Sequence, residues 1–104
     1  MSRRLIFACA PSIIWIRDVD QVLLVDQETK QSWSLRGVSA VVWDLVTVGH
    51  SHQRIVPLLS LIISLPIEEV ERDLTKVLGK WLDEGIVQAS GEAKDGELDR
   101  QCGM

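Results

Sequence analysis

Short apolar runs separated by polar links mark the first third of the chain. Residues 13–16 (IIWI) and 22–25 (VLLV) are rich in β-branched residues, and the polar RDVDQ between them is typical of a turn. After a second polar link, DQETK, residues 31–35 (QSWSL) alternate polar and apolar side chains. Successive strands with short links favour an antiparallel meander. We therefore predict three strands, with residues 31–35 at an edge of the sheet.

The apolar spacing then changes to steps of three and four residues. This spacing predicts a helix from Gly37 to Gly49, where glycine tolerates the left-handed cap conformation. Residues 54–63 are apolar on nearly every side, which predicts a second helix, with Pro57 in its first turn, buried at the centre of the core. The inward face of the first helix comprises Val38, Val41, Val42, Leu45 and Val48.

A third helix is predicted to begin at Pro66 and to be stopped by Gly85. Glu68 and Glu69 suit its positive N-terminal end. Its inward stripe comprises Ile67, Val70, Leu74, Val77, Leu78 and Trp81, with Leu82 at the margin.

The chain has 104 residues, which fits one domain. We expect residues 1–11 to form an N-terminal extension, residues 12–87 the domain, and residues 88–104 a disordered tail with almost no large apolar residue. Residues 86–87 are expected to pair briefly with the sheet. The predicted fold class is α+β, a winged helix-turn-helix with a three-stranded antiparallel sheet followed by three helices.

Charge and composition exclude several classes of binding partner. Eleven Lys and Arg against 15 Asp and Glu give a net charge of −4, so nucleic acid is not the expected partner. No stretch approaches the ~20 apolar residues that span a bilayer, so no membrane is expected either. Cys9 and Cys102 form no C-x-x-C motif, and the apolar run over residues 5–10 is shorter than a signal-peptide core of about 7–15 residues. We therefore expect a cytoplasmic protein.

Residues suited to catalysis or metal binding are sparse. His50 and His52 stand two residues apart without a third ligand, which makes a poor metal site. The chain contains no G-x-S-x-G, Gly-rich phosphate loop or H-E-x-x-H. The sequence therefore predicts no catalytic residues, no metal and no cofactor.

A recurring pattern over about residues 12–87 resembles the PqqD-like proteins, also called recognition elements of ribosomally made, post-translationally modified peptides. The pattern consists of VLLVD, WSL, GVSAVVWDL, a glycine ending that helix, and WLDEGIV. Two positions depart from it: Arg36 stands where Asn typically follows the Leu, and Val48-Gly49 replaces a common Asp-Gly. The second departure argues against the pyrroloquinoline quinone protein itself. The strand pair VLLVDQETKQSW is more similar to that of the small stand-alone proteins of lasso-peptide pathways.

The resemblance implies a non-catalytic peptide chaperone. Such proteins bind the N-terminal leader of a precursor peptide and present it to a leader peptidase or a modifying enzyme. The leader adds to the free edge of the third strand, beside the third helix. An exposed edge suits this mode, since its unpaired backbone groups accept an extended peptide. The expected peptide-binding residues are Gln31, Ser32, Trp33, Ser34, Leu35, Val70, Asp73, Leu74, Lys76 and Val77.

Several alternatives stay open. Trp33 could be a core residue, a groove wall, or both. Either shoulder of the third helix could face the groove, one with Val77 and Lys80, the other with Thr75 and Leu82. Arg72 and Lys76 could hold an acidic leader residue or form a solvated helix face.

The competing function is a winged-helix, DNA-binding transcription regulator. Residues 68–84, the natural recognition helix, carry six acids and three bases, which opposes phosphate binding. A structural subunit is the third possibility. An open strand edge could also pair with its own copy and so form a homodimer.

Overall fold

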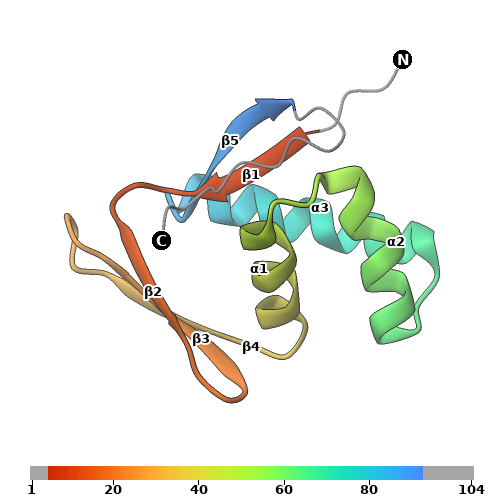
Figure 1. Cartoon of the computed structure of the whole chain (residues 1–104), viewed down its shortest axis with the longest axis horizontal. Helices are drawn as coiled ribbons and strands as arrows, with labels where there is room; N and C mark the ends of the chain where they lie inside the picture. The colour runs from red at the N-terminus through yellow and green to blue at the C-terminus, as the bar shows by residue number, and fades with distance from the viewer. Residues whose placement is uncertain (1–4, 93–104) are drawn as a thin grey trace.

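The computed structural model describes residues 5–92 and combines two small sheets with three helices (Figure 1). The order of elements is β1 (Leu5–Cys9), β2 (Ile13–Arg17), β3 (Gln21–Asp26), β4 (Ser32–Arg36), α1 (Val38–Val48), α2 (His52–Ile63), α3 (Ile67–Asp83) and β5 (Val87–Glu92). The predicted α+β class, a three-stranded antiparallel sheet followed by three helices, is confirmed.

Strands β2, β3 and β4 form the predicted meander, in that order. The link between β3 and β4 is fixed by Asp26, whose carboxylate accepts the backbone N–H groups of Glu28 at 2.8 Å and Thr29 at 3.3 Å. The bond from Glu28 is the main cause of a lowered pKa of Asp26, because it stabilises the charged carboxylate. Lys30 closes the turn with a positive φ of 67°. This turn sets the register in which β4 lies against β3.

The second sheet corrects the sequence analysis at both ends of the chain. Within the expected N-terminal extension, β1 pairs antiparallel with β5. Residues 88–92, expected to begin a disordered tail, belong to β5, while residues 93–104 lie outside the described part of the chain. Val87 does pair, but with Cys9 of β1 and not with the three-stranded sheet.

Glycines end two of the helices as predicted. Gly49 caps α1 with a φ of 108°, and Gly85 follows α3 with a φ of 78°. After α3 the Ile86 N–H donates to the Trp81 carbonyl at 2.9 Å, and the Gly85 N–H donates to the Leu82 carbonyl at 3.1 Å. Such bonds satisfy the last carbonyls of a helix and turn the chain sharply. The turn directs the chain from α3 into β5.

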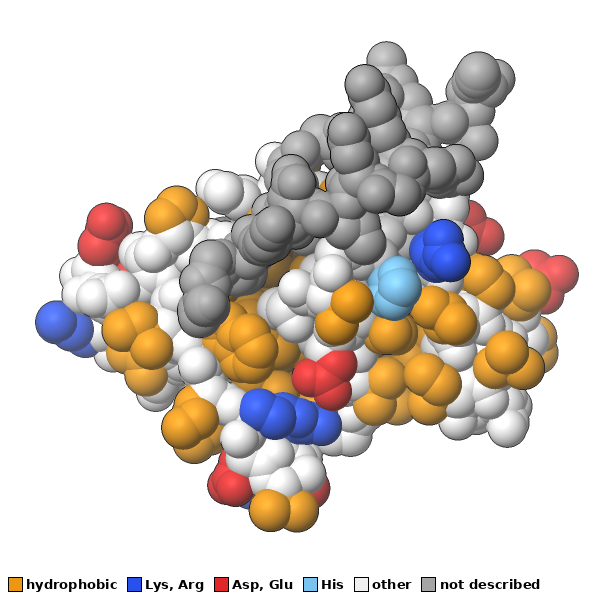
Figure 2. Space-filling model, viewed as in Figure 1, with side chains coloured by type: hydrophobic (Ala, Val, Ile, Leu, Met, Phe, Trp, Pro, Cys, Tyr) orange, Lys and Arg blue, Asp and Glu red, His pale blue; other side chains and the backbone are white. Residues whose placement is uncertain are grey.

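Two predictions for α2 are wrong. The helix begins at His52, because the Ser51 side chain accepts the Arg54 N–H at 3.2 Å and caps it, so Pro57 lies beyond the first turn. The helix is also not the centre of the core: Leu61 is 80% exposed and Ile62 55%, and Figure 2 shows hydrophobic side chains at the surface in the region of α2. It packs by one face against α1, α3 and β1.

The centre of the core is α1. Trp43 is fully buried, and its ring meets Trp15 of β2 and Trp81 of α3 edge to face, each at a centroid distance of 5.6 Å. These contacts join the inner face of the three-stranded sheet to α3 through α1. Trp43 therefore fixes the position of the three-stranded sheet, which includes β4, relative to α3.

Candidate functional site

Strand β4 has one free edge in the part of the chain that the structure describes, because it pairs with β3 alone. The Asp26 N–H donates to the Gln31 carbonyl at 2.8 Å. This bond identifies the hydrogen-bonded residue pairs between β3 and β4. Such pairs alternate in antiparallel strands, so the backbone N–H and C=O groups of Ser32 and Ser34 point away from β3. These are the groups that a further strand would meet.

A pocket of about 300 Å³ lies between β4 and α3. Its apolar wall consists of Trp33 and Leu35 from the strand side and Val77 and Trp81 from α3. Polar residues complete the lining: Ser34, Ser39, Lys80 and Glu84. The pocket therefore offers an apolar interior with one cation and one anion among its lining residues.

Helical spacing explains how α3 contributes this wall. Val77, Lys80, Trp81 and Glu84 follow one another at steps of three, one and three residues, which brings all four to one side of the helix. Of the two shoulders left open by the sequence, the one with Val77 and Lys80 lines the pocket. The spacing from Val77 is the signal that could have identified Trp81 and Glu84 beforehand.

Trp33 lies both against the core and at the pocket. It is partly buried and packs against the hydrophobic core, and it also lines the pocket. Trp33 lies opposite Leu24 of β3, and Leu24 lies opposite Trp15 of β2. The groove wall is therefore an extension of the inner face of the sheet.

The structure brings together only part of the predicted set. Trp33, Ser34, Leu35 and Val77 meet at the pocket. Gln31 and Ser32 are exposed at the beginning of β4, and Asp73 is exposed one helical turn before Val77. Val70 and Leu74 are buried in the core beneath α3. Ser39, Lys80, Trp81 and Glu84 line the pocket although the predicted set did not include them.

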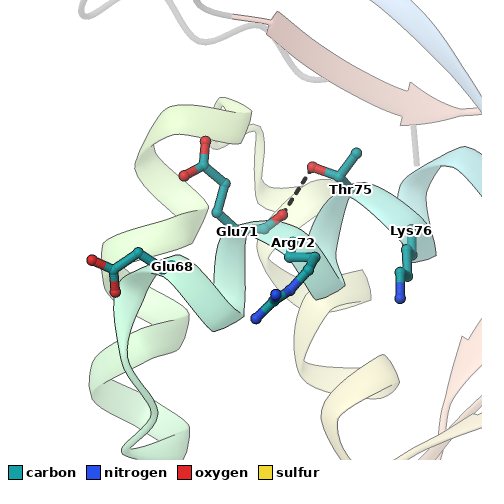
Figure 3. Close-up of a pocket in the computed structure, with 5 residues that line it drawn as sticks. All are labelled: Glu68, Glu71, Arg72, Thr75 and Lys76. Atoms are coloured by element: carbon teal, nitrogen blue, oxygen red, sulfur yellow. Dashed lines mark hydrogen bonds between the residues drawn. The ribbon is translucent and has the colours of Figure 1, made fainter.

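Lys76 lies elsewhere, on the outer face of α3. There it lines a shallow concavity of about 480 Å³ with Glu68, Glu71, Arg72 and Thr75 (Figure 3). In this view Arg72 and Lys76 extend from one side of the helix, and Glu71 and Thr75 from the other. The Thr75 hydroxyl donates to the Glu71 carbonyl at 2.8 Å. The face thus mixes both signs of charge.

No group of three or more His, Cys, Asp and Glu in the described chain is placed to hold a metal ion. No helix among these residues is long and apolar enough to cross a membrane.

Comparison with known proteins gives two matches. The family described as "Coenzyme PQQ synthesis protein D (PqqD)" matches residues 21–87. A solved structure described as "TbiB1 in Complex with the TbiA(beta) Leader Peptide" is similar in fold, with a TM-score of 0.74 and 22% sequence identity over 88% of this chain and 99% of that chain. No curated protein sequence matches significantly.

Proposed function

The chain belongs to the PqqD family, and we propose that it binds the leader of a ribosomally synthesised precursor peptide as an added β-strand. The observation that carries this proposal is the free edge of β4 directly beside the pocket on α3. The fold similarity to TbiB1, whose structure contains a leader peptide, supports leader binding.

Binding would begin with the backbone. The outward N–H and C=O groups of Ser32 and Ser34 can pair with any extended peptide, whatever its side chains. The serine side chains are short, and the Ser34 hydroxyl is held by Gln21 Oε1 at 2.8 Å. An approaching strand therefore meets few bulky or charged side chains on that face of β4.

Selection of one leader requires side-chain contacts. Alternate residues of an added strand point to opposite faces of the sheet, so every second leader residue would face the pocket. Trp33, Val77 and Trp81 suit an apolar or aromatic leader side chain, while Lys80 and Glu84 suit flanking residues of opposite charge. A peptide of about a dozen residues would cover the edge and the groove at micromolar or tighter affinity.

We assign the chain no catalytic step. In this proposal it presents the bound leader to a separate leader peptidase or peptide-modifying enzyme in the cytoplasm. The likeness of its strand pair to stand-alone lasso-peptide proteins makes a lasso-peptide pathway the proposed setting. The mixed charges on the outer face of α3 favour this function over DNA reading.

The test is a titration with synthetic leaders of short precursor peptides identified among the neighbouring genes. Trp33 and Trp81 line the pocket, so the intrinsic fluorescence should change on binding. Ser34→Pro removes an outward N–H and should weaken binding about tenfold or more, whereas Ser34→Ala keeps that N–H and should bind normally. Ser32→Pro should act like Ser34→Pro.

The controls separate this mode from its alternatives. A scrambled peptide of the same composition and a double-stranded DNA should leave the fluorescence unchanged. A flat titration with the genuine leader contradicts leader binding. Equal affinities of Ser34→Pro and Ser34→Ala would place the peptide somewhere other than the edge of β4.

A further inference from the structure

The opposite edge of the same sheet is also open. Strand β2 pairs with β3 alone among the described strands. The Asp18 N–H donates to the Gln21 carbonyl at 2.8 Å, so by alternation the backbone groups of Trp15 and Arg17 point away from β3. The start of the strand is less open, because the Cys9 thiol lies 3.8 Å from the Ile13 carbonyl oxygen. The accessible stretch is therefore Trp15 to Arg17.

This edge has few of the features that usually prevent strand pairing. Natural edge strands carry lysines, prolines or bulges, but β2 reads IIWIR and pairs regularly along its length. Its one charged residue, Arg17, is engaged within the molecule, with Nη2 3.2 Å from Asp44 Oδ2. On the outer face Ile14 is 55% exposed and Ile16 is 62% exposed. Leu23 and Val25 of β3 lie beside them, 39% and 42% exposed.

We propose that this edge pairs with β2 of a second copy of the chain, antiparallel and about a two-fold axis at Ile16. In this register Trp15 of each copy lies opposite Arg17 of the other. Their outward backbone groups would form four hydrogen bonds, and the two Ile16 side chains would meet across the axis on the outer face. The contact is isologous, so it closes as a dimer and does not extend into a filament.

A second copy suits this edge better than a foreign peptide does. Beside β4 a pocket on α3 can select side chains, whereas β2 is flanked on its outer face by the apolar side chains of its own hairpin. Self-pairing places the same apolar surface on both sides of the axis. Four partly exposed side chains supply less than the about 800 Å² per partner of a stable complex, so we expect a dissociation constant in the micromolar range or weaker.

Dimerisation at β2 leaves β4 free, because the two strands occupy opposite edges of the sheet. A dimer would then carry two separate leader edges. Self-association at β2 would stand even if β4 bound no leader.

Sedimentation equilibrium of the full chain over about 1 μM to 1 mM tests the dimer, because this range brackets the expected affinity. The weight-average mass should rise above the 11.7 kDa of one chain. Ile16→Lys places two like charges opposite each other and should raise the dissociation constant about tenfold or more. Leu61→Lys, an equally drastic change at an 80% exposed position of α2, should dimerise like the natural chain.

A second pair of variants tests the backbone contacts. Arg17→Pro removes one outward N–H from each copy, and should also weaken dimerisation about tenfold or more. Arg17→Ala loses the same ion pair with Asp44 but keeps the N–H, so it should still dimerise. Circular dichroism and the thermal unfolding transition verify that each variant is folded.

Three results would overturn the proposal. The mass could stay at that of one chain throughout the series. Arg17→Ala could lose dimerisation as fully as Arg17→Pro does. Finally, Leu61→Lys or Ser34→Pro could abolish the dimer, which would place the interface on α2 or on β4.

Discussion

Trp43 buries a polar group in the core at a cost to the stability of the fold. Its ring is fully buried, yet its indole nitrogen has no hydrogen-bond partner among the described residues. Trp43→Ala should lower the free energy of unfolding by about 3–5 kcal/mol, because a large cavity opens between Trp15 and Trp81. Trp43→Phe should cost clearly less, since losing an unpartnered buried N–H regains about 1–3 kcal/mol. Urea denaturation of both variants measures the difference.

The control for this comparison is Val19→Ala. Val19 is 92% exposed, and a truncation at such a surface position should change the free energy of unfolding by no more than about 0.5 kcal/mol. If Trp43→Phe and Trp43→Ala destabilise equally, the indole N–H has a partner that the described residues do not supply.

Individual site residues were predictable where one short-range pattern decided them. Alternation in residues 31–35 placed Trp33 and Leu35 on one face, and both line the pocket. The contribution of α3 was not decided in this way, because a helix has two shoulders and the sequence does not say which one faces a neighbour. Lys76, which the sequence analysis included in the peptide-binding set, lies on the outer face of α3, whereas Lys80 lines the pocket. Which side of α3 faces β4 depends on how α1 packs between the sheet and α3, and that packing cannot be read from the sequence of α3.

The start of α2 depends on a single cap. Ser51 is buried, and its side chain accepts the Arg54 N–H at 3.2 Å. Ser51→Ala should therefore lower the free energy of unfolding by about 1 kcal/mol, as the loss of a serine cap usually does. Ser51→Asp keeps an acceptor at the same place and should retain most of the stability. Thermal unfolding of the two variants checks this, and equal losses would show that burial at this position matters more than the cap.

Whole elements were predictable when their hydrogen bonds and apolar faces are local. The meander, α1 and α3 follow from turn residues, glycine caps and helical spacing, and all are present. The pair β1 and β5 was missed, because each strand finds its partner about 80 residues away, and no local pattern reports such pairing. The sequence of β5, VQASGE, is typical of a loop, and the segment is a strand because it pairs with β1.

At the scale of the molecule, the two sheets have different roles. The three-stranded sheet has its own two open edges at β2 and β4, while the pair β1 and β5 joins the two ends of the described chain. Phe7 and Cys9 of β1 and Val87 of β5 belong to the same buried cluster as the tryptophans. The second sheet therefore contributes to the common core without touching the proposed leader groove.

This division predicts that stability and binding can be separated. Phe7 is 9% exposed, and Phe7→Ala should cost about 3–5 kcal/mol, a large fraction of the about 5–15 kcal/mol of a typical domain. Leu61→Ala, at an 80% exposed position, should be nearly neutral. At a low temperature where the Phe7→Ala variant is still folded, its affinity for the leader should equal that of the natural chain. A weakened affinity under those conditions would mean that the second sheet takes part in positioning β4 and α3, and the division would be wrong.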